Sequence, residues 1–230
     1  MRVCIFVDDP NEGDLFRPIL THVGLEVSVS TNLEPALENW PQDSAELVVL
    51  ASDNEAILLK NITMVRATTQ VPLLVIADTV SENDLCTMLT SGVDLVLERP
   101  VSPRVLANYA RVLLRRSETV PSFVLTSLEL DEITLDPATR TVTVTGQDPQ
   151  RLTHLEFRLL YVLMLNREQV VPTDVIVDRV WGYDGGGDRE LVRGLISRLR
   201  RKLEPDPEQP RFIQTVTGLG YLFTLEGVNL

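Results

Sequence analysis

The sequence has 230 residues, of which 44% are hydrophobic and 23% charged, and its formal net charge at pH 7 is −12. This composition excludes a disordered chain, and the length allows two domains with separate cores. No apolar run approaches the roughly 20 residues of a membrane-spanning helix. The first apolar run, at the N-terminus, is too short for the core of a secretory signal. We therefore expect a cytoplasmic protein without a membrane partner. The two cysteines and two histidines lack metal-ligand spacing, so we expect no metal cluster and no cofactor.

Short apolar runs and longer helical patterns alternate along residues 1–116. The predicted strands are residues 3–7, 25–29, 47–50, 73–77 and 95–97. The helical patterns include residues 14–23, 33–40, 81–92 and 103–116. Five strands that alternate with helices predict an α/β domain, in which helices cover both faces of a five-stranded parallel, doubly wound sheet.

The carboxyl ends of the predicted strands carry the residues of a candidate site, because ligands of parallel sheets bind at this edge. Those residues are Asp8, Asp9, Ala51, Ala77 and Arg99. The acidic pair after the first strand and Arg99-Pro100 after the fifth resemble the receiver domain of response regulators, and the resemblance covers residues 1–117. It implies that Ala51 stands at the phospho-accepting aspartate position and Ala77 at a threonine or serine position.

Formation of an acyl phosphate requires a carboxylate nucleophile, a divalent cation and groups that hold the phosphoryl oxygens. Ala51 supplies no nucleophile, and Asp8 with Asp9 would bind Mg²⁺ only weakly without a third carboxylate. Asp53 is an alternative nucleophile because it could face the same way, and an acidic pair such as Asp8-Asp9 is more often a turn or a helix cap. The resemblance therefore implies a degenerate receiver, unable to accept a phosphoryl group in the usual way.

Receivers of the OmpR group pair through their fourth helix, fifth strand and fifth helix. The resemblance implies contacts at Asp94, Val105 and Tyr109 in this chain. Val105 and Tyr109 are four residues apart and stand roughly where the family carries a Glu and an Arg. We therefore expect an apolar homodimer contact that does not need phosphorylation, although much of the same helical stripe must pack on the sheet.

A linker at residues 118–124 precedes a second predicted domain at residues 125–230. Its patterns predict strands at 128–135 and 141–145, helices at 153–165, 173–182 and 189–203, and a hairpin at 212–223. Thr153 and Glu156 form the pattern of a capping box at the start of the first helix. Three helices followed by a β-hairpin predict a winged helix, a variant of the helix-turn-helix.

The third helix of this domain separates apolar and basic residues onto two faces. Residues 189–202 contain six basic side chains and one acid, Glu190. The apolar face consists of Leu191, Val192, Leu195, Ile196, Leu199 and Leu203. The opposite face consists of Arg189, Arg193, Ser197, Arg200 and Arg201. Such a row is usually only a solvated surface, but in a winged helix it would enter the major groove of DNA.

Four blocks of residues 125–225 resemble the OmpR-type effector domain in order and spacing. They are Leu152-Thr153 with Glu156-Phe157, Val180-Trp181-Gly182, residues 196–203, and Thr215-Val216 with Gly218, Gly220 and Tyr221. The resemblance implies DNA contacts at Ser197, Arg198, Arg200 and Thr215. Three positions depart from the family. Thr217 replaces the wing arginine, Glu190 replaces an arginine common near the start of the helix, and Leu195 replaces a polar residue.

The sequence as a whole predicts a dimeric transcription regulator that binds double-stranded DNA without aspartyl phosphorylation. By resemblance, the loop at residues 183–188 is a possible contact for RNA polymerase. Glu190 and Thr217 leave open an alternative, a protein-interaction adaptor with weakened DNA binding. We find no nucleophile–base pair or metal cluster that would indicate an enzyme.

Overall fold

The computed structural model describes residues 1–118, 127–182 and 189–225. The chain divides into an N-terminal unit, Met1–Glu118, and a C-terminal unit, Thr119–Leu230. Of the predicted linker at residues 118–124, only Glu118 is described, and it ends a helix. None of the described helices is both long and apolar enough to cross a membrane.

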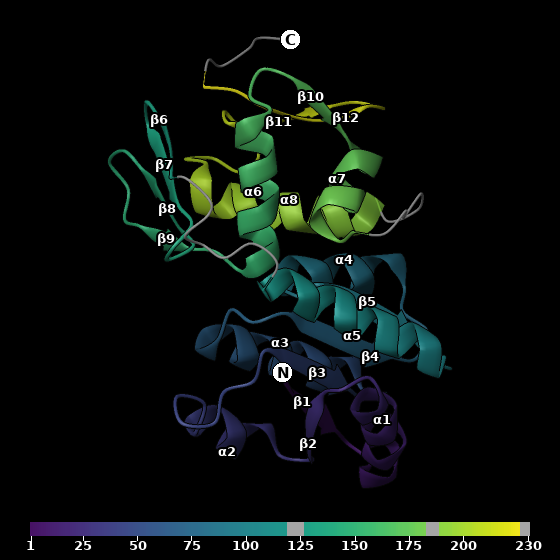
Figure 1. The fold of residues 1–230 in the computed structure, drawn as a ribbon. Helices are drawn as coiled ribbons and strands as arrows, with labels where there is room; N and C mark the ends of the chain where they lie inside the picture. The colour runs from purple at the N-terminus through teal and green to yellow at the C-terminus, as the bar shows by residue number, and fades with distance from the viewer. Residues whose placement is uncertain (119–126, 183–188, 226–230) are drawn as a thin grey trace. The chain divides into compact units, whose positions relative to one another are not determined.

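The N-terminal unit is an α/β fold with five parallel strands, which confirms the predicted fold class (Figure 1). The strands are β1 (Arg2–Val7), β2 (Glu26–Ser30), β3 (Leu47–Ala51), β4 (Leu73–Ala77) and β5 (Leu95–Glu98), in the sheet order β2-β1-β3-β4-β5. The helices are α1 (Pro10–His22), α2 (Leu33–Glu38), α3 (Glu55–Thr68), α4 (Glu82–Ser91) and α5 (Pro103–Glu118).

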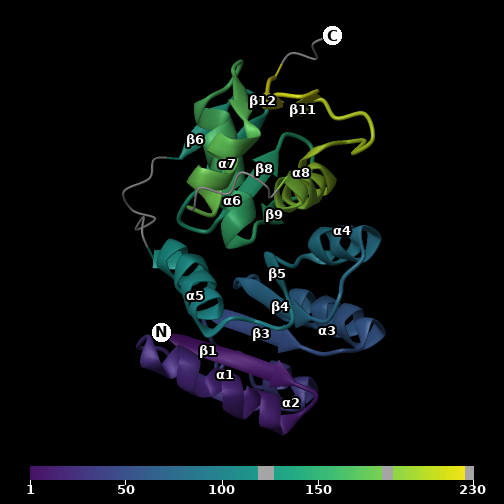
Figure 2. The same ribbon diagram turned by 90° about the vertical axis from the view of Figure 1, so that its right-hand side faces the viewer.

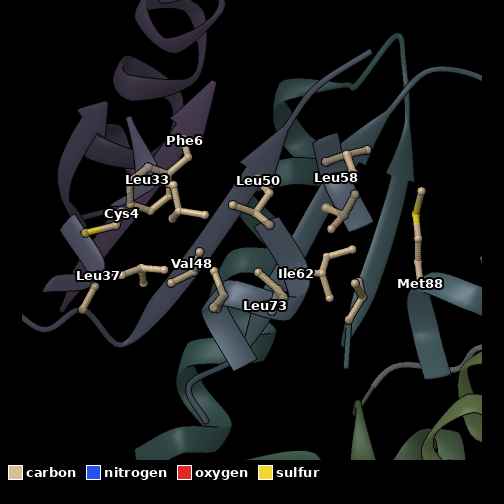
Figure 3. Close-up of a cluster of buried hydrophobic side chains, with 14 of the residues drawn as sticks. Cys4, Phe6, Leu33, Leu37, Val48, Leu50, Leu58, Ile62, Leu73 and Met88 are labelled. Carbon is tan, nitrogen blue, oxygen red and sulfur yellow. The ribbon is translucent and has the colours of Figure 1, made fainter. Parts of the chain in front are cut away.

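Helices cover both faces of this sheet. On one face α1 packs beside α5, and on the other α3 packs between α2 and α4. Alternate strand residues such as Phe6, Leu50 and Leu73 point to the second face, where they meet side chains of α2, α3 and α4 (Figure 3). The inner strands β1, β3 and β4 are apolar along nearly their whole length because both of their faces are buried.

Helix α1 begins four residues earlier than the helical periodicity predicted. The Asp9 carboxylate accepts a hydrogen bond from the Asn11 backbone N–H at 2.9 Å, and Pro10 occupies the first helical position. An aspartate N-cap followed by proline is a strong start signal that the apolar spacing alone does not contain. Asp9 is therefore a helix cap, the structural alternative considered from the sequence.

The C-terminal unit has the predicted order of three helices and a hairpin, with two additions. Its elements are β6 (Leu128–Leu130), β7 (Ile133–Asp136), β8 (Thr141–Val144), β9 (Gln150–Arg151), α6 (His154–Leu165), β10 (Val170–Pro172), α7 (Thr173–Val180), α8 (Arg189–Leu203), β11 (Ile213–Val216) and β12 (Gly220–Phe223). The single strand predicted at 128–135 is wrong, because a turn with Asp131 at φ 34° splits it into two antiparallel strands. Strand β10, which we did not predict, pairs with β12.

Helix α8 buries its predicted apolar face completely. It packs against α6 and α7, and in two perpendicular views it lies beside α6 (Figures 1 and 2). A buried carboxylate, Glu156 of α6, joins the two helices, since Lys202 Nζ lies 2.7 Å from its Oε2 and Arg198 Nε 3.7 Å from its Oε1. Glu156 also completes the predicted capping box with Thr153. Burial raises the pKa of Glu156, but Arg198 and Lys202 outweigh burial, so the net shift is downward.

A second buried carboxylate, Asp94, closes the turn between α4 and β5. Its Oδ2 accepts hydrogen bonds from Arg66 Nη2 and from the Leu73 backbone N–H, both at 2.9 Å. Arg66 also donates to the Gly92 carbonyl at 2.9 Å. Asp94 is only 1% exposed, so the expected dimer contact at this residue is wrong. The sequence placed Asp94 beside the fifth strand but contained no sign that Arg66, on α3, would cover it.

Loss of one partner of the buried Arg66–Asp94 ion pair should destabilise the N-terminal unit strongly. We expect Arg66→Met to lower the free energy of unfolding by about 3–5 kcal/mol, because it leaves a buried carboxylate without its cation. The matched change Lys60→Met breaks the exposed Lys60–Glu34 pair and should cost less than about 1 kcal/mol. Urea unfolding followed by Trp40 fluorescence in a Trp181→Phe background measures both, and equal losses would contradict the assignment.

Glu156 should make the C-terminal unit sensitive to acid. Because folding lowers the pKa of Glu156 from its ordinary value of 4.5, its stabilising contribution is complete above pH 4.5 and is lost as the pH falls through the lowered value. Glu156→Gln should therefore be less stable by about 3–5 kcal/mol at pH 7 and lose less stability below pH 4.5. Urea unfolding followed by Trp181 fluorescence in a Trp40→Phe background tests this, with the exposed Glu129→Gln as control. If the Glu156→Gln variant lost as much stability below pH 4.5 as the wild type, the prediction would be refuted.

Candidate nucleic-acid interface and receiver site

The structure brings together the predicted residues at the carboxyl edge of the N-terminal sheet. Val7 pairs with Ala51, Ala51 pairs with Ile76, and Ala77 pairs with Glu98. The ends of β1, β3, β4 and β5 are therefore neighbours, and the segments that follow these strands meet at one edge.

Arg99 binds three of these segments together. Its Nε and Nη2 donate to the two carboxylate oxygens of Glu12 at 2.6 and 2.9 Å. Its Nη1 donates to Asp78 Oδ1 at 3.0 Å and to the Ser52 carbonyl at 3.2 Å. The hydrogen bond to Glu12 is the main reason that the pKa of Arg99 is raised. One guanidinium thus links the start of α1 to the residues that follow β3 and β4.

The two carboxylates of the acidic pair point to different partners. Asp8 accepts a hydrogen bond from the buried Ser52 hydroxyl, whereas Asp9 caps α1. Asp53 is exposed in the loop before α3. Within residues 1–118, 127–182 and 189–225, no group of three or more His, Cys, Asp or Glu side chains is placed to hold a metal ion.

Sequence reasoning missed Glu12, Ser52 and Asp78 in this site. Ser52 directly follows the last strand residue, Ala51, so extending each strand end by one residue would have found it. Glu12 is 87 residues from Arg99, and no local pattern pairs them. Only the folded sheet brings them into contact.

The basic residues of α8 separate into two groups. Arg189, Arg193 and Arg201 are exposed, whereas Arg200 is half-buried. Arg198 is only 6% exposed, because it lies against Glu156, so its predicted DNA contact is contradicted. Ser197 is half-buried, and Thr215 and Thr217 on the wing are exposed.

The wing is the β11–β12 hairpin, whose turn is formed by residues 217–219. Gly220 is the first residue of β12 and pairs with Pro172 of β10. A Cβ atom at Gly220 would lie 2.0 Å from the Val171 carbonyl oxygen. Only glycine fits this approach, which explains why the hairpin motif carries glycine at that position.

Two hollows lie between α8 and the wing, and they share Arg193, Thr215 and Tyr221. One, of about 500 Å³, is also lined by Arg189 and by the start of α7, and the other, of about 650 Å³, by Ser197, Arg200 and Arg201. Exposed guanidinium and hydroxyl groups are donors that suit phosphate oxygens and base edges. Three acids lie at this surface. Asp174 lines the first hollow and Glu208 the second, and Glu190 Oε1 accepts from Arg193 Nη1 at 2.9 Å.

On α5, the two residues predicted at a dimer contact lie on the side away from the buried Leu106 and Ala110. Val105 is 39% exposed and Tyr109 is half-buried. Leu106 and Leu113 of the same stripe pack inward, and Val112 is half-buried. An exposed valine one turn from a partly exposed tyrosine is a small apolar surface.

Comparisons with known proteins cover nearly the whole chain. Residues 147–223 match the family model "Transcriptional regulatory protein, C terminal". A solved structure of a mutant of RitR has the same fold, with a TM-score of 0.72 at 19% identity over 96% of this chain and 98% of the other. The DNA-binding response regulator MtrA of Mycobacterium tuberculosis H37Rv is 30% identical, covering 96% of this chain and 95% of MtrA. The DNA-binding dual master transcriptional regulator RpaA of Synechocystis is 31% identical, covering 97% and 95%. The chain therefore belongs to the OmpR-type response regulators, a family of transcription regulators and not of enzymes.

Proposed function

We propose that this chain is a cytoplasmic, sequence-specific transcription regulator that binds double-stranded DNA through α8 and the wing. The observation that carries the proposal is the exposure of Arg189, Arg193 and Arg201 on the outer face of α8, beside the wing hydroxyl of Thr215. Thr217 is exposed on the wing turn. The chain has a net charge of −12, so its overall electrostatic attraction to DNA is weak. A local basic surface on such a chain suits DNA binding that depends on specific contacts of individual side chains. The names of MtrA and RpaA, both DNA-binding, support it.

We further propose that the regulator acts without aspartyl phosphorylation. Ala51 and Ala77 lack the nucleophile and the hydroxyl that phosphoryl transfer would use at their positions. Arg99 is already engaged by Glu12 and Asp78, so the cation that would hold phosphoryl oxygens has two carboxylate partners. In this proposal the ion pairs of Arg99 with Glu12 and Asp78 replace the interactions that a phosphoryl group and a metal ion would form at this edge.

Dimerisation through α5 is part of the same proposal. Val105 and Tyr109 would form an apolar contact between two receivers, in place of contacts that depend on phosphorylation. The proposed contact of the loop at 183–188 with RNA polymerase lies outside the described residues. It stays a proposal from the family resemblance alone.

A protein-interaction adaptor is the second candidate, and one contact favours it. Glu190 forms an ion pair with Arg193 and so offsets one of the three exposed arginines of α8. Thr217 adds no charge at the wing turn. An adaptor would not need salt-dependent DNA binding, whereas each phosphate neutralised by a regulator adds about 0.9 to the slope of log K against log salt.

Salt-titrated binding of the full-length protein to DNA fragments selected from its genome decides between the two candidates. We expect specific binding whose slope falls by about 0.9 per protomer in Arg201→Ala. Arg193→Ala should lower the slope less, because Glu190 already offsets that charge. Arg167→Ala, an exposed arginine just beyond α6, is the matched control and should leave the slope unchanged. A flat salt response in a folded wild-type protein would favour the adaptor.

Sedimentation tests the phosphorylation-independent dimer. We expect a dimer at micromolar concentrations, unchanged by Mg²⁺ with beryllofluoride, a phosphoryl mimic that needs an acceptor carboxylate. Val105→Glu should dissociate it, because a carboxylate would be buried in an apolar contact. Leu15→Glu on α1 replaces a residue 67% exposed and should have no effect. A monomer at high micromolar concentration, or a dimer formed only with beryllofluoride, would contradict the proposal.

A further inference from the structure

Side chains at the end of α8 hold both backbone groups of Ile213, the first residue of wing strand β11. The Ile213 N–H donates to Glu204 Oε1 at 2.8 Å. Its carbonyl oxygen accepts from Arg200 Nε at 3.0 Å and from Arg200 Nη2 at 2.7 Å. In the described part of the chain β11 pairs only with β12, at the edge of the sheet β10-β12-β11. The outward backbone N–H and C=O groups of an edge strand usually form hydrogen bonds with water. Here the side chains of Arg200 and Glu204 form these hydrogen bonds, as a further strand would do.

Glu204 and Arg200 act at different points of β11. Glu204 also accepts from the backbone N–H groups of Arg211 and Phe212, at 2.8 and 2.9 Å, so it anchors the segment that enters the strand. Arg200 Nη2 reaches two residues further and donates to Thr215 Oγ1 at 2.9 Å. Thr215 pairs with Tyr221 and the next residue with Gly220, after which the wing turn begins. Of these two side chains, Arg200 therefore holds the strand closer to the turn.

The contacts of Arg200 use the fork of a guanidinium. Two N–H groups converge on one carbonyl oxygen while a third reaches the hydroxyl, and a lysine ammonium has no planar fork with which to repeat this arrangement. The adjacent arginine makes a useful comparison. Arg201 is exposed, and its hydrogen bond to Ser197 of its own helix is a long one of 3.5 Å. Neighbouring arginines of α8 thus face different surroundings.

We propose that Arg200 is a positioning residue for DNA binding, which holds the wing at a set distance from the exposed arginines of α8. Helix and wing can then contact one DNA duplex together, and Arg200 acts on DNA through β11 instead of reading bases itself. This inference rests on the proposed DNA binding. It assigns the predicted contact residue Arg200 a different role from Arg193 and Arg201.

A charge placed on the wing turn tests this role. Thr217→Arg adds one cation at the turn, and in the wild-type background it should raise the salt slope of DNA binding by about 0.9 per protomer. The same change is then made in full-length Arg200→Lys and in Arg201→Lys, two backgrounds that keep the charge of α8. We expect the added slope to persist in Arg201→Lys and to fall by at least half in Arg200→Lys. A change that affected only stability would leave this increment intact in the folded protein.

The possible results are distinct. Persistence of the full increment in Arg200→Lys overturns the inference while leaving the proposed function intact, and so does a Thr217→Arg change without effect on a wild type that binds DNA. A folded wild type without salt-dependent DNA binding refutes the proposed function and the inference with it. Should Arg200→Lys not fold, the exposed Thr215→Val removes the contact nearest the turn and should reduce the increment in its place.

Discussion

Helix α8 must bury one whole face while it carries six basic side chains, and a cation leaves water only when a partner replaces its solvation. The partners available around the helix therefore decide what each cation does. Arg198 and Lys202 form ion pairs with Glu156, and Arg200 donates hydrogen bonds to the carbonyl oxygen of Ile213. Arg189, Arg193 and Arg201 remain at the surface. The packing of the winged helix and the composition of its outer face thus follow from one requirement.

The same requirement operates at the carboxyl edge of the N-terminal sheet. Arg99 is three-quarters buried, and Glu12, Asp78 and the Ser52 carbonyl surround its guanidinium. These contacts join the start of α1 to the residues that follow β3 and β4. Arg99 and its acidic partners therefore hold this edge together although Ala51 and Ala77 carry no reactive group. This is the physical basis of the proposed independence from phosphorylation.

Local signals predicted the elements well because each signal acts within a few residues. Apolar runs and helical periodicity located the five strands of the first sheet and the three helices of the winged helix. The errors were local as well. Asp9-Pro10 outweighed the periodicity at the start of α1, a turn at Asp131 divided one predicted strand into two, and β10 is too short to show a pattern.

The sequence by itself determined the fold of each unit, the family, and which residues share a face of α8. Spacing is sufficient for these because the geometry of helices and strands is regular. Only the tertiary structure decided that Arg198 faces a carboxylate 42 residues earlier, that Arg200 holds β11, and that Asp94 is covered by Arg66. Helical spacing assigned Arg200 and Arg201 to the same outer face. What separates them is the group that packs opposite each one, and that group comes from a distant part of the chain.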